Sequence, residues 1–104
     1  MASKRDLKKD VDQLIYEVVS ECYSYVDFYP EGDHNKAYEI ADKAMELREE
    51  IIAQINYKDK SISSKEIKEH FNEVKKSFIE KVEALFKEVD VLFEEQEKAE
   101  KKEA

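Results

Sequence analysis

The sequence predicts an all-α protein, an antiparallel up-down-up three-helix bundle with a longer C-terminal helix. Three observations lead to this fold class. The single proline and the single glycine of the 104-residue chain, Pro30 and Gly32, lie two residues apart. The stretches on either side are rich in Glu, Lys, Leu and Ala, which favour helix. Apolar residues recur every three or four positions in three stretches, the period of a helix with one buried face. This length fits one domain, so we interpret residues 1–104 as a single helical domain.

The first helix is expected over residues 3–29. Ser3 is a favourable N-cap, and Asp6 follows three residues later. Pro30 ends the helix because it has no backbone N–H to donate, and a turn over residues 31–34 follows. The apolar face of this helix comprises Leu7, Val11, Leu14, Val18, Cys22, Val26 and Tyr29. Cys22 is the only cysteine of the chain, and we interpret it as a small buried hydrophobe.

The second helix is expected over residues 34–57, after Asp33 or Asn35, either of which can cap it. Its inner face comprises Ala37, Ala41, Ala44, Ile51, Ile52 and Ile55. The alanines near its start let neighbouring helices approach closely. Because the turns are short, each helix is expected to run antiparallel to the one before it.

Arg48 interrupts the apolar face of the second helix. Its aliphatic stem can lie on apolar surface while the charged head reaches the edge. Alternatively the guanidinium is partly buried and needs a carboxylate partner, because an unpaired buried charge costs several kcal/mol. Counting back from the Pro30 turn puts Glu17 level with Arg48 and Glu21 one turn away. Either acid is therefore a candidate for a structural ion pair.

The third helix is expected over residues 63–97. Ser63 or Ser64 can cap it, and Ser63 with Glu66 fits a capping box. Its inward seam comprises Ile67, Phe71, Val74, Phe78, Val82, Leu85, Val89 and Leu92. From residue 94 onward the chain contains only Glu, Gln, Lys and Ala, so we expect a frayed tail over residues 98–104.

A third helix longer than the others is expected to pass the turn that joins the first two. Val89, Leu92 and Phe93 would then extend beyond the bundle, and they must either cover Tyr29 and Pro30 or pack against another molecule. Tyrosines are favoured in interfaces because they combine apolar area with a polar tip. The candidate interface therefore comprises Tyr16, Tyr23, Tyr29, Val89, Leu92 and Phe93.

Charge excludes some classes of partner. A formal net charge of −8 argues against nucleic acid and anionic membranes, which bind basic surfaces. No stretch approaches the roughly 20 apolar residues of a membrane span, and the N-terminus has no apolar signal core, so a cytoplasmic protein is expected. Residues 10–32 hold six acids and no Lys or Arg, whereas residues 1–9 carry a net charge of +3. This separation predicts an antiparallel homodimer with opposite ends facing, or a basic protein partner.

Motifs for chemistry are weak. His70 lies between Glu66 and Glu73 at helical spacing, and we interpret it as a surface histidine among glutamates, not a metal ligand. One glycine cannot build a phosphate-binding loop, and we expect no catalytic residue and no cofactor. The sequence favours a non-enzymatic interaction or structural module that self-associates. The alternative is a binding or enzymatic domain that uses the acidic end of the bundle for a metal or a cationic ligand.

Three segments carry a family resemblance. They are Tyr16-Glu17-Val18, the run from Met45 to Ile52 (Met-Glu-Leu-Arg-Glu-Glu-Ile-Ile), and His70-Phe71 onward. Together they resemble a small uncharacterised helical family from Bacteroidetes-type bacteria. The resemblance covers most of the chain, and it implies a compact helical protein of unknown function with no site residue to carry over.

Overall fold

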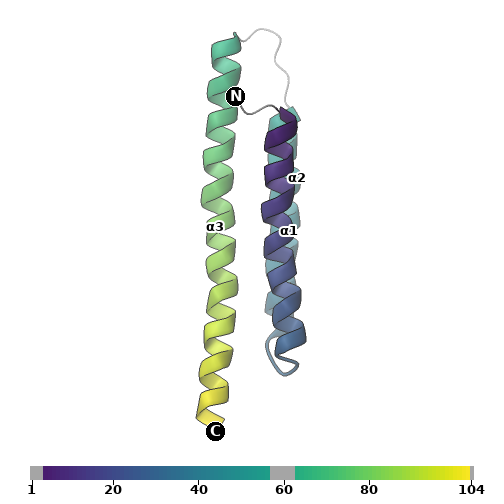
Figure 1. Cartoon of the computed structure of the whole chain (residues 1–104), viewed down its shortest axis with the longest axis vertical. Coiled ribbons are helices and arrows are strands. Elements are labelled where there is room, and N and C mark those ends of the chain that lie inside the picture. Colours follow the sequence, from purple (N-terminus) through teal and green to yellow (C-terminus); the bar gives the residue numbers. More distant parts are fainter. Residues whose placement is uncertain (1–3, 57–62, 104) are drawn as a thin grey trace.

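A computed structural model of the chain describes residues 4–56 and 63–103. Within these ranges the chain forms three α-helices and no strand, which confirms the predicted all-helical class (Figure 1). The helices are α1 (Lys4–Phe28), α2 (His34–Asn56) and α3 (Ser64–Glu103). Among the described residues no helix is both long enough and apolar enough to cross a membrane.

The three helices lie side by side in a rod of 63 × 17 × 16 Å. In Figure 1, α1 and α3 run in the same direction and α2 runs in the opposite direction. Contacts between α2 and α3 agree with this arrangement, because Lys43 Nζ lies 3.2 Å from Glu88 Oε1 and Lys81 Nζ lies 3.0 Å from Glu50 Oε1. A later residue of α2 thus meets an earlier residue of α3, as in antiparallel helices.

One apolar cluster runs along the inside of the rod. Each helix contributes most of the face that its apolar spacing predicted. The exception is Ile67, which was predicted in the inward seam of the third helix but is 39% exposed, near the start of α3. The buried side chains are Leu7, Val11, Ile15, Val18, Cys22, Tyr25, Tyr29, Ala37, Ile40, Ala41, Ala44, Leu47, Ile51, Ile55, Val74, Phe78, Val82, Leu85, Val89 and Leu92. Among the described residues, no polar or charged residue other than the core cysteine and tyrosines is buried.

The turn between α1 and α2 is built around the ring of Tyr25. The Tyr25 hydroxyl accepts a hydrogen bond of 3.0 Å from the backbone N–H of Asp33. A Cβ atom at Gly32 would lie only 2.5 Å from that hydroxyl oxygen, so the tight approach requires glycine. Asp33 Oδ1 accepts from the N–H of Lys36 at 3.1 Å, which confirms Asp33 as a cap of α2. His34 Nε2 donates to the carbonyl oxygen of Tyr29 at 2.9 Å.

The helix ends differ from the prediction mainly at the C-terminus. Ser63 Oγ accepts from the N–H of Glu66 at 3.2 Å, so the predicted cap of the third helix is confirmed. The helix then continues to Glu103, and the expected frayed tail is wrong over residues 98–103. Its composition explains the difference, because Ala, Glu and Lys are strong helix formers. Ser3, Tyr57 and the last residue of the expected tail lie outside the described residues.

As predicted, α3 extends beyond the turn that joins α1 and α2 (Figure 1), but residues 89–93 do not overhang the bundle. Of the two predicted alternatives, these residues follow the first and cover Tyr29. Val89 and Leu92 lie in the core, with 0% and 2% of their surface exposed. The ring of Phe93 contacts those of Tyr25 and Tyr29, with centroid distances of 5.4 and 5.8 Å. Figure 1 shows the reason, since α3 begins well beyond the ends of α1 and α2 that lie beside it. This shift brings residues 89–93 level with the end of α1, where they cover Tyr29 within the chain itself.

Candidate interaction surface

Four large apolar side chains are exposed along the outer side of the α1–α2 pair. Tyr16 and Tyr23 of α1 have 73% and 53% of their surface exposed, and Tyr38 and Met45 of α2 have 43% and 46%. Within each helix the two residues are seven positions apart, a spacing that returns to the same side after two turns. We call these four residues the α1–α2 strip.

Two contacts fix the register of α1 against α2. The rings of Tyr23 and Tyr38 lie 6.3 Å apart between centroids, and Arg48 Nε lies 2.6 Å from Asp12 Oδ1. In an antiparallel pair, seven residues back along α1 correspond to seven residues forward along α2. Tyr16 is therefore level with Met45, and the strip extends over both helices for about 10 Å along the rod.

The Arg48–Asp12 ion pair borders one end of the strip. The predicted partners Glu17 and Glu21 are wrong, because Asp12 lies five residues before Glu17. The count aligned α1 and α2 incorrectly along the rod. The contact between Tyr23 and Tyr38 shows that the midpoint of the turn lies nearer to Pro30 than we assumed, so an earlier residue of α1 is level with Arg48. With 38% of the Arg48 side chain exposed, the guanidinium lies at the edge of the apolar face, as the first of the two alternatives expected.

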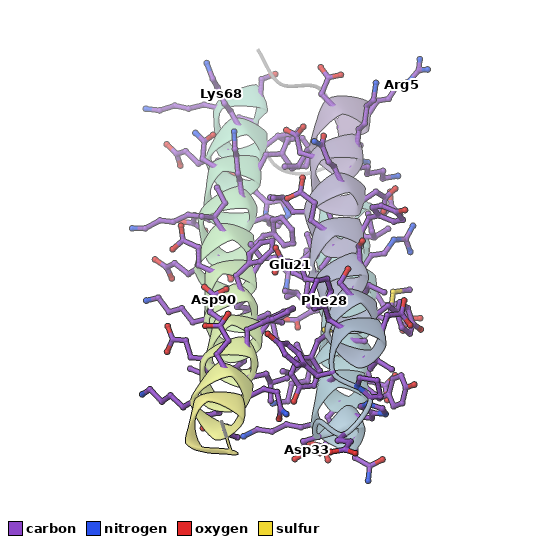
Figure 2. All side chains as sticks on the ribbon, turned by 60° about the horizontal axis from the view of Figure 1, so that its bottom comes forward. Arg5, Glu21, Phe28, Asp33, Lys68 and Asp90 are labelled. Atoms are coloured by element: carbon purple, nitrogen blue, oxygen red, sulfur yellow. The ribbon has the colours of Figure 1, made fainter. Side chains whose placement is uncertain are left out.

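Charges beside the strip change sign along the rod. Helical spacing puts Lys9 before Tyr16 and Asp27 after Tyr23 on the same side of α1, and both are exposed. Figure 2 shows Arg5 and Lys68 at one end of the rod and Asp33 at the other. Along α1, the strip therefore lies between the basic Lys9 and the acidic Asp27, whereas α2 exposes the acids Glu46 and Glu49 beside Met45.

The other outer side of α1, toward α3, has a different character. Burial raises the pKa of the Glu21 carboxyl, and the charges of Asp90 and Glu17 raise it further. Figure 2 shows Glu21 and Asp90 on these two helices in the acidic half of the rod. Toward the basic end, a pocket of about 210 Å³ opens among Leu7, Asp10, Gln13, Leu14, Lys75, Phe78 and Ile79.

Groups that could carry chemistry are held in structural roles. Burial, followed by the charge of Glu21, raises the pKa of the Cys22 thiol to about 11, so it stays protonated and is a poor nucleophile. His70, expected at the surface, is half-buried instead, and its Nε2 lies 2.9 Å from the carbonyl oxygen of Gln54 in α2. In the part of the chain that the structure describes, no three His, Cys, Asp or Glu side chains are grouped so as to hold a metal ion.

The structure divides the six residues of the predicted interface. Tyr16 and Tyr23 are exposed, whereas Tyr29, Val89 and Leu92 are buried and Phe93 packs against the core. Tyr38 and Met45 were missed as surface partners. Their seven-residue spacing beside the apolar face of the second helix was a signal for them.

No protein-family model matches the chain, and neither a curated protein nor a solved structure matches it. The comparisons therefore assign no family, and the resemblance to a bacterial helical family stays a prediction.

Proposed function

We propose that this chain is a non-enzymatic interaction module, an up-down-up three-helix bundle that forms a homodimer in the cytoplasm through the α1–α2 strip. The observation that carries the proposal is the strip itself. Its four side chains come from two helices, lie at matching levels and are between 43% and 73% exposed.

The fold has little need of these four residues. The core is complete on the opposite sides of α1 and α2, where every buried position of the two helices is apolar, a tyrosine or Cys22. Single exposed apolar residues are common on protein surfaces, but a contiguous group marks a contact site more often. Tyrosine and methionine are also the types enriched in interface cores. These facts favour a surface that binds protein.

The size of the surface predicts a weak complex. α1 has 25 residues and is about 37 Å long, and the rod is 17 Å wide. The α1–α2 strip takes up only about 10 Å of this length, so we expect the contact to lie below the about 800 Å² that each partner contributes to a standard interface. We expect a dissociation constant in the micromolar range.

Sedimentation velocity over a wide range of protein concentration tests this proposal. The variant Tyr16→Gln/Met45→Gln removes half of the strip without changing net charge or helix propensity greatly. Its matched control is Phe28→Gln/Val91→Gln, which changes two equally exposed apolar residues outside the strip, 76% and 43% exposed. Circular dichroism of both variants reports whether the helices remain intact.

We expect the wild-type chain and the control to dimerise alike, and the strip variant to dimerise at least about tenfold more weakly, equivalent to 1.4 kcal/mol. A wild-type chain that stays monomeric at millimolar concentration would contradict the proposal. Equal weakening of the strip variant and the control would contradict it as well, because the contact surface would then lie elsewhere.

A further inference from the structure

We propose that the two copies pair antiparallel, about a two-fold axis that crosses α1 beside Ser20, with Lys9 of each copy facing Asp27 and Glu31 of the other. This inference rests on the proposed function and specifies its partner as a second copy in one orientation. It names a symmetry axis and two equivalent charge contacts, each of which is open to a separate test.

The position of the axis follows from the strip. On α1 the midpoint between Tyr16 and Tyr23 falls at residues 19–20, and on α2 the midpoint between Tyr38 and Met45 falls at residues 41–42. The Tyr23–Tyr38 contact and the Asp12–Arg48 ion pair put these two midpoints at the same level. With a two-fold axis through both midpoints, Tyr16 of one copy faces Tyr23 of the other, and Tyr38 of one copy faces Met45 of the other. The contact is isologous and closes on itself as a dimer.

Charge selects the antiparallel orientation over the parallel one. Lys9 is the last cation of α1, because residues 10–32 contain no Lys or Arg. In the antiparallel pair Lys9 lies level with residue 30 of the other copy, within one turn of Asp27 and Glu31. A parallel pair would instead bring Asp27 near a second Asp27 and Lys9 near a second Lys9. Attraction between opposite ends steers association and suppresses the wrong orientation.

The same symmetry creates one unfavourable contact that can be tested. Asp42 is exposed on α2 at the level of the axis, so the two copies of Asp42 lie close to one another. Like charges at short range repel, and removing one charge per copy relieves the repulsion. We therefore expect Asp42→Asn to tighten the dimer by about twofold to fivefold, and an unchanged or weaker dimer would contradict an axis at the level of Asp42.

Cross-linking tests the axis directly. Ser20 is exposed and next to the axis, so Ser20→Cys places two thiols close together, and a short bis-maleimide is expected to link them. The control Ser24→Cys is also exposed, but its two thiols are separated by about 12 Å along the helices. The native Cys22 does not interfere, because it is fully buried and its pKa is raised to about 11. Stronger linking at Ser24→Cys than at Ser20→Cys would overturn the proposed axis.

A charge exchange tests the orientation. Lys9→Glu and Asp27→Lys each place like charges together at both ends of a homodimer, and each is expected to weaken dimerisation about tenfold. A mixture of the two variants restores opposite charges at both ends of the heterodimer, so it is expected to associate within about twofold of wild type. Both substitutions suit the helix dipole of α1, which keeps the fold intact.

The outcomes separate the two claims. A wild-type dimer whose charge variants are not rescued by mixing, and whose Ser20→Cys form does not cross-link, overturns the antiparallel orientation and leaves the interaction module standing. A wild-type chain that is monomeric under all conditions overturns the proposed function and this inference together.

Discussion

Two pairs of tyrosines on the same helix have opposite roles. Tyr25 and Tyr29 are buried, and the hydroxyl of Tyr25 receives a hydrogen bond from the turn that follows. Tyr16 and Tyr23 lie in the same stretch without cations, yet more than half of each side chain is exposed. Tyr25 follows Tyr16 by nine residues, which at 100° per residue points it to the opposite side of α1.

The comparison shows that residue type and local charge do not distinguish a structural tyrosine from a contact tyrosine. A structural tyrosine differs from a contact tyrosine in the side of the helix on which it lies and in having a buried hydrogen-bond partner for its hydroxyl. A buried tyrosine needs such a partner, because an unsatisfied polar group costs free energy. In this chain the Asp33 N–H provides it for Tyr25, and the bulk of Tyr25 in turn dictates a glycine at position 32.

Truncating one tyrosine of each pair gives the largest expected difference. Tyr25→Ala opens a cavity in the core and removes two ring contacts, so we expect it to lower the free energy of unfolding by about 3–5 kcal/mol. Tyr16→Ala, at an exposed position, is expected to change it by less than about 0.5 kcal/mol. Urea unfolding at submicromolar protein concentration measures both without a contribution from association. A similar loss of unfolding free energy in the two variants would contradict the distinction between a structural and an exposed tyrosine.

Adding a methyl group at the turn tests the packing around Tyr25. Gly32→Ala places a Cβ atom 2.8 Å from the Tyr25 ring carbon that bears the hydroxyl, so the ring must shift. We expect a loss of about 1–3 kcal/mol, typical of overpacking. Tyr25→Phe alone should cost about 1 kcal/mol, because it leaves the Asp33 N–H without its partner.

The double variant separates the two effects. With the hydroxyl absent, Gly32→Ala is expected to cost less in the Tyr25→Phe background than in wild type, and thermal melts of the four proteins measure this coupling. Strict additivity would mean that the hydroxyl does not limit the space at Gly32.

Arg48 tests the border between core and strip. Arg48→Ala removes both the aliphatic stem and the ion pair, and we expect a loss of about 1 kcal/mol. Arg48→Met keeps most of the stem, so its loss should stay below about 0.5 kcal/mol, as should that of Asp12→Asn, which removes the pair alone. Chemical unfolding in dilute solution measures all three. If Arg48→Met is as damaging as Arg48→Ala, the ion pair contributes more than the stem.

The smallest expected effect lies on the acidic side of α1. Because the pKa of Glu21 is raised, the folded chain holds this proton more tightly than the unfolded chain, whose value is 4.5. Stability therefore falls as the pH rises from about 4.5 through the raised pKa. Glu21→Gln is expected to stabilise by a few tenths of a kcal/mol at pH 7, typical of an exposed like-charge pair, and by nothing below pH 4. An equal gain at both pH values would assign the effect to packing.

Much of the fold follows from the sequence, because the apolar spacing fixes which side of each helix is buried. The register between helices does not follow from it, since a shift of one turn keeps the same apolar faces together. That is why Asp12 replaced Glu17 beside Arg48, and why Val89 proved to be covered within the chain. Two of the four residues of the α1–α2 strip were predicted from the sequence. Tyr16 and Tyr23 stood out in their own helix, but only the register brought Tyr38 and Met45 beside them.

The most direct test of the contact surface is a two-dimensional amide NMR spectrum recorded over a range of protein concentration. We predict that signals near residues 12–27 of α1 and 38–49 of α2 shift or broaden as the concentration rises, whereas those on the outer side of α3, such as Val91, stay constant. A spectrum independent of concentration, or changes centred on α3, would contradict the claim that the exposed tyrosines form the dimer surface.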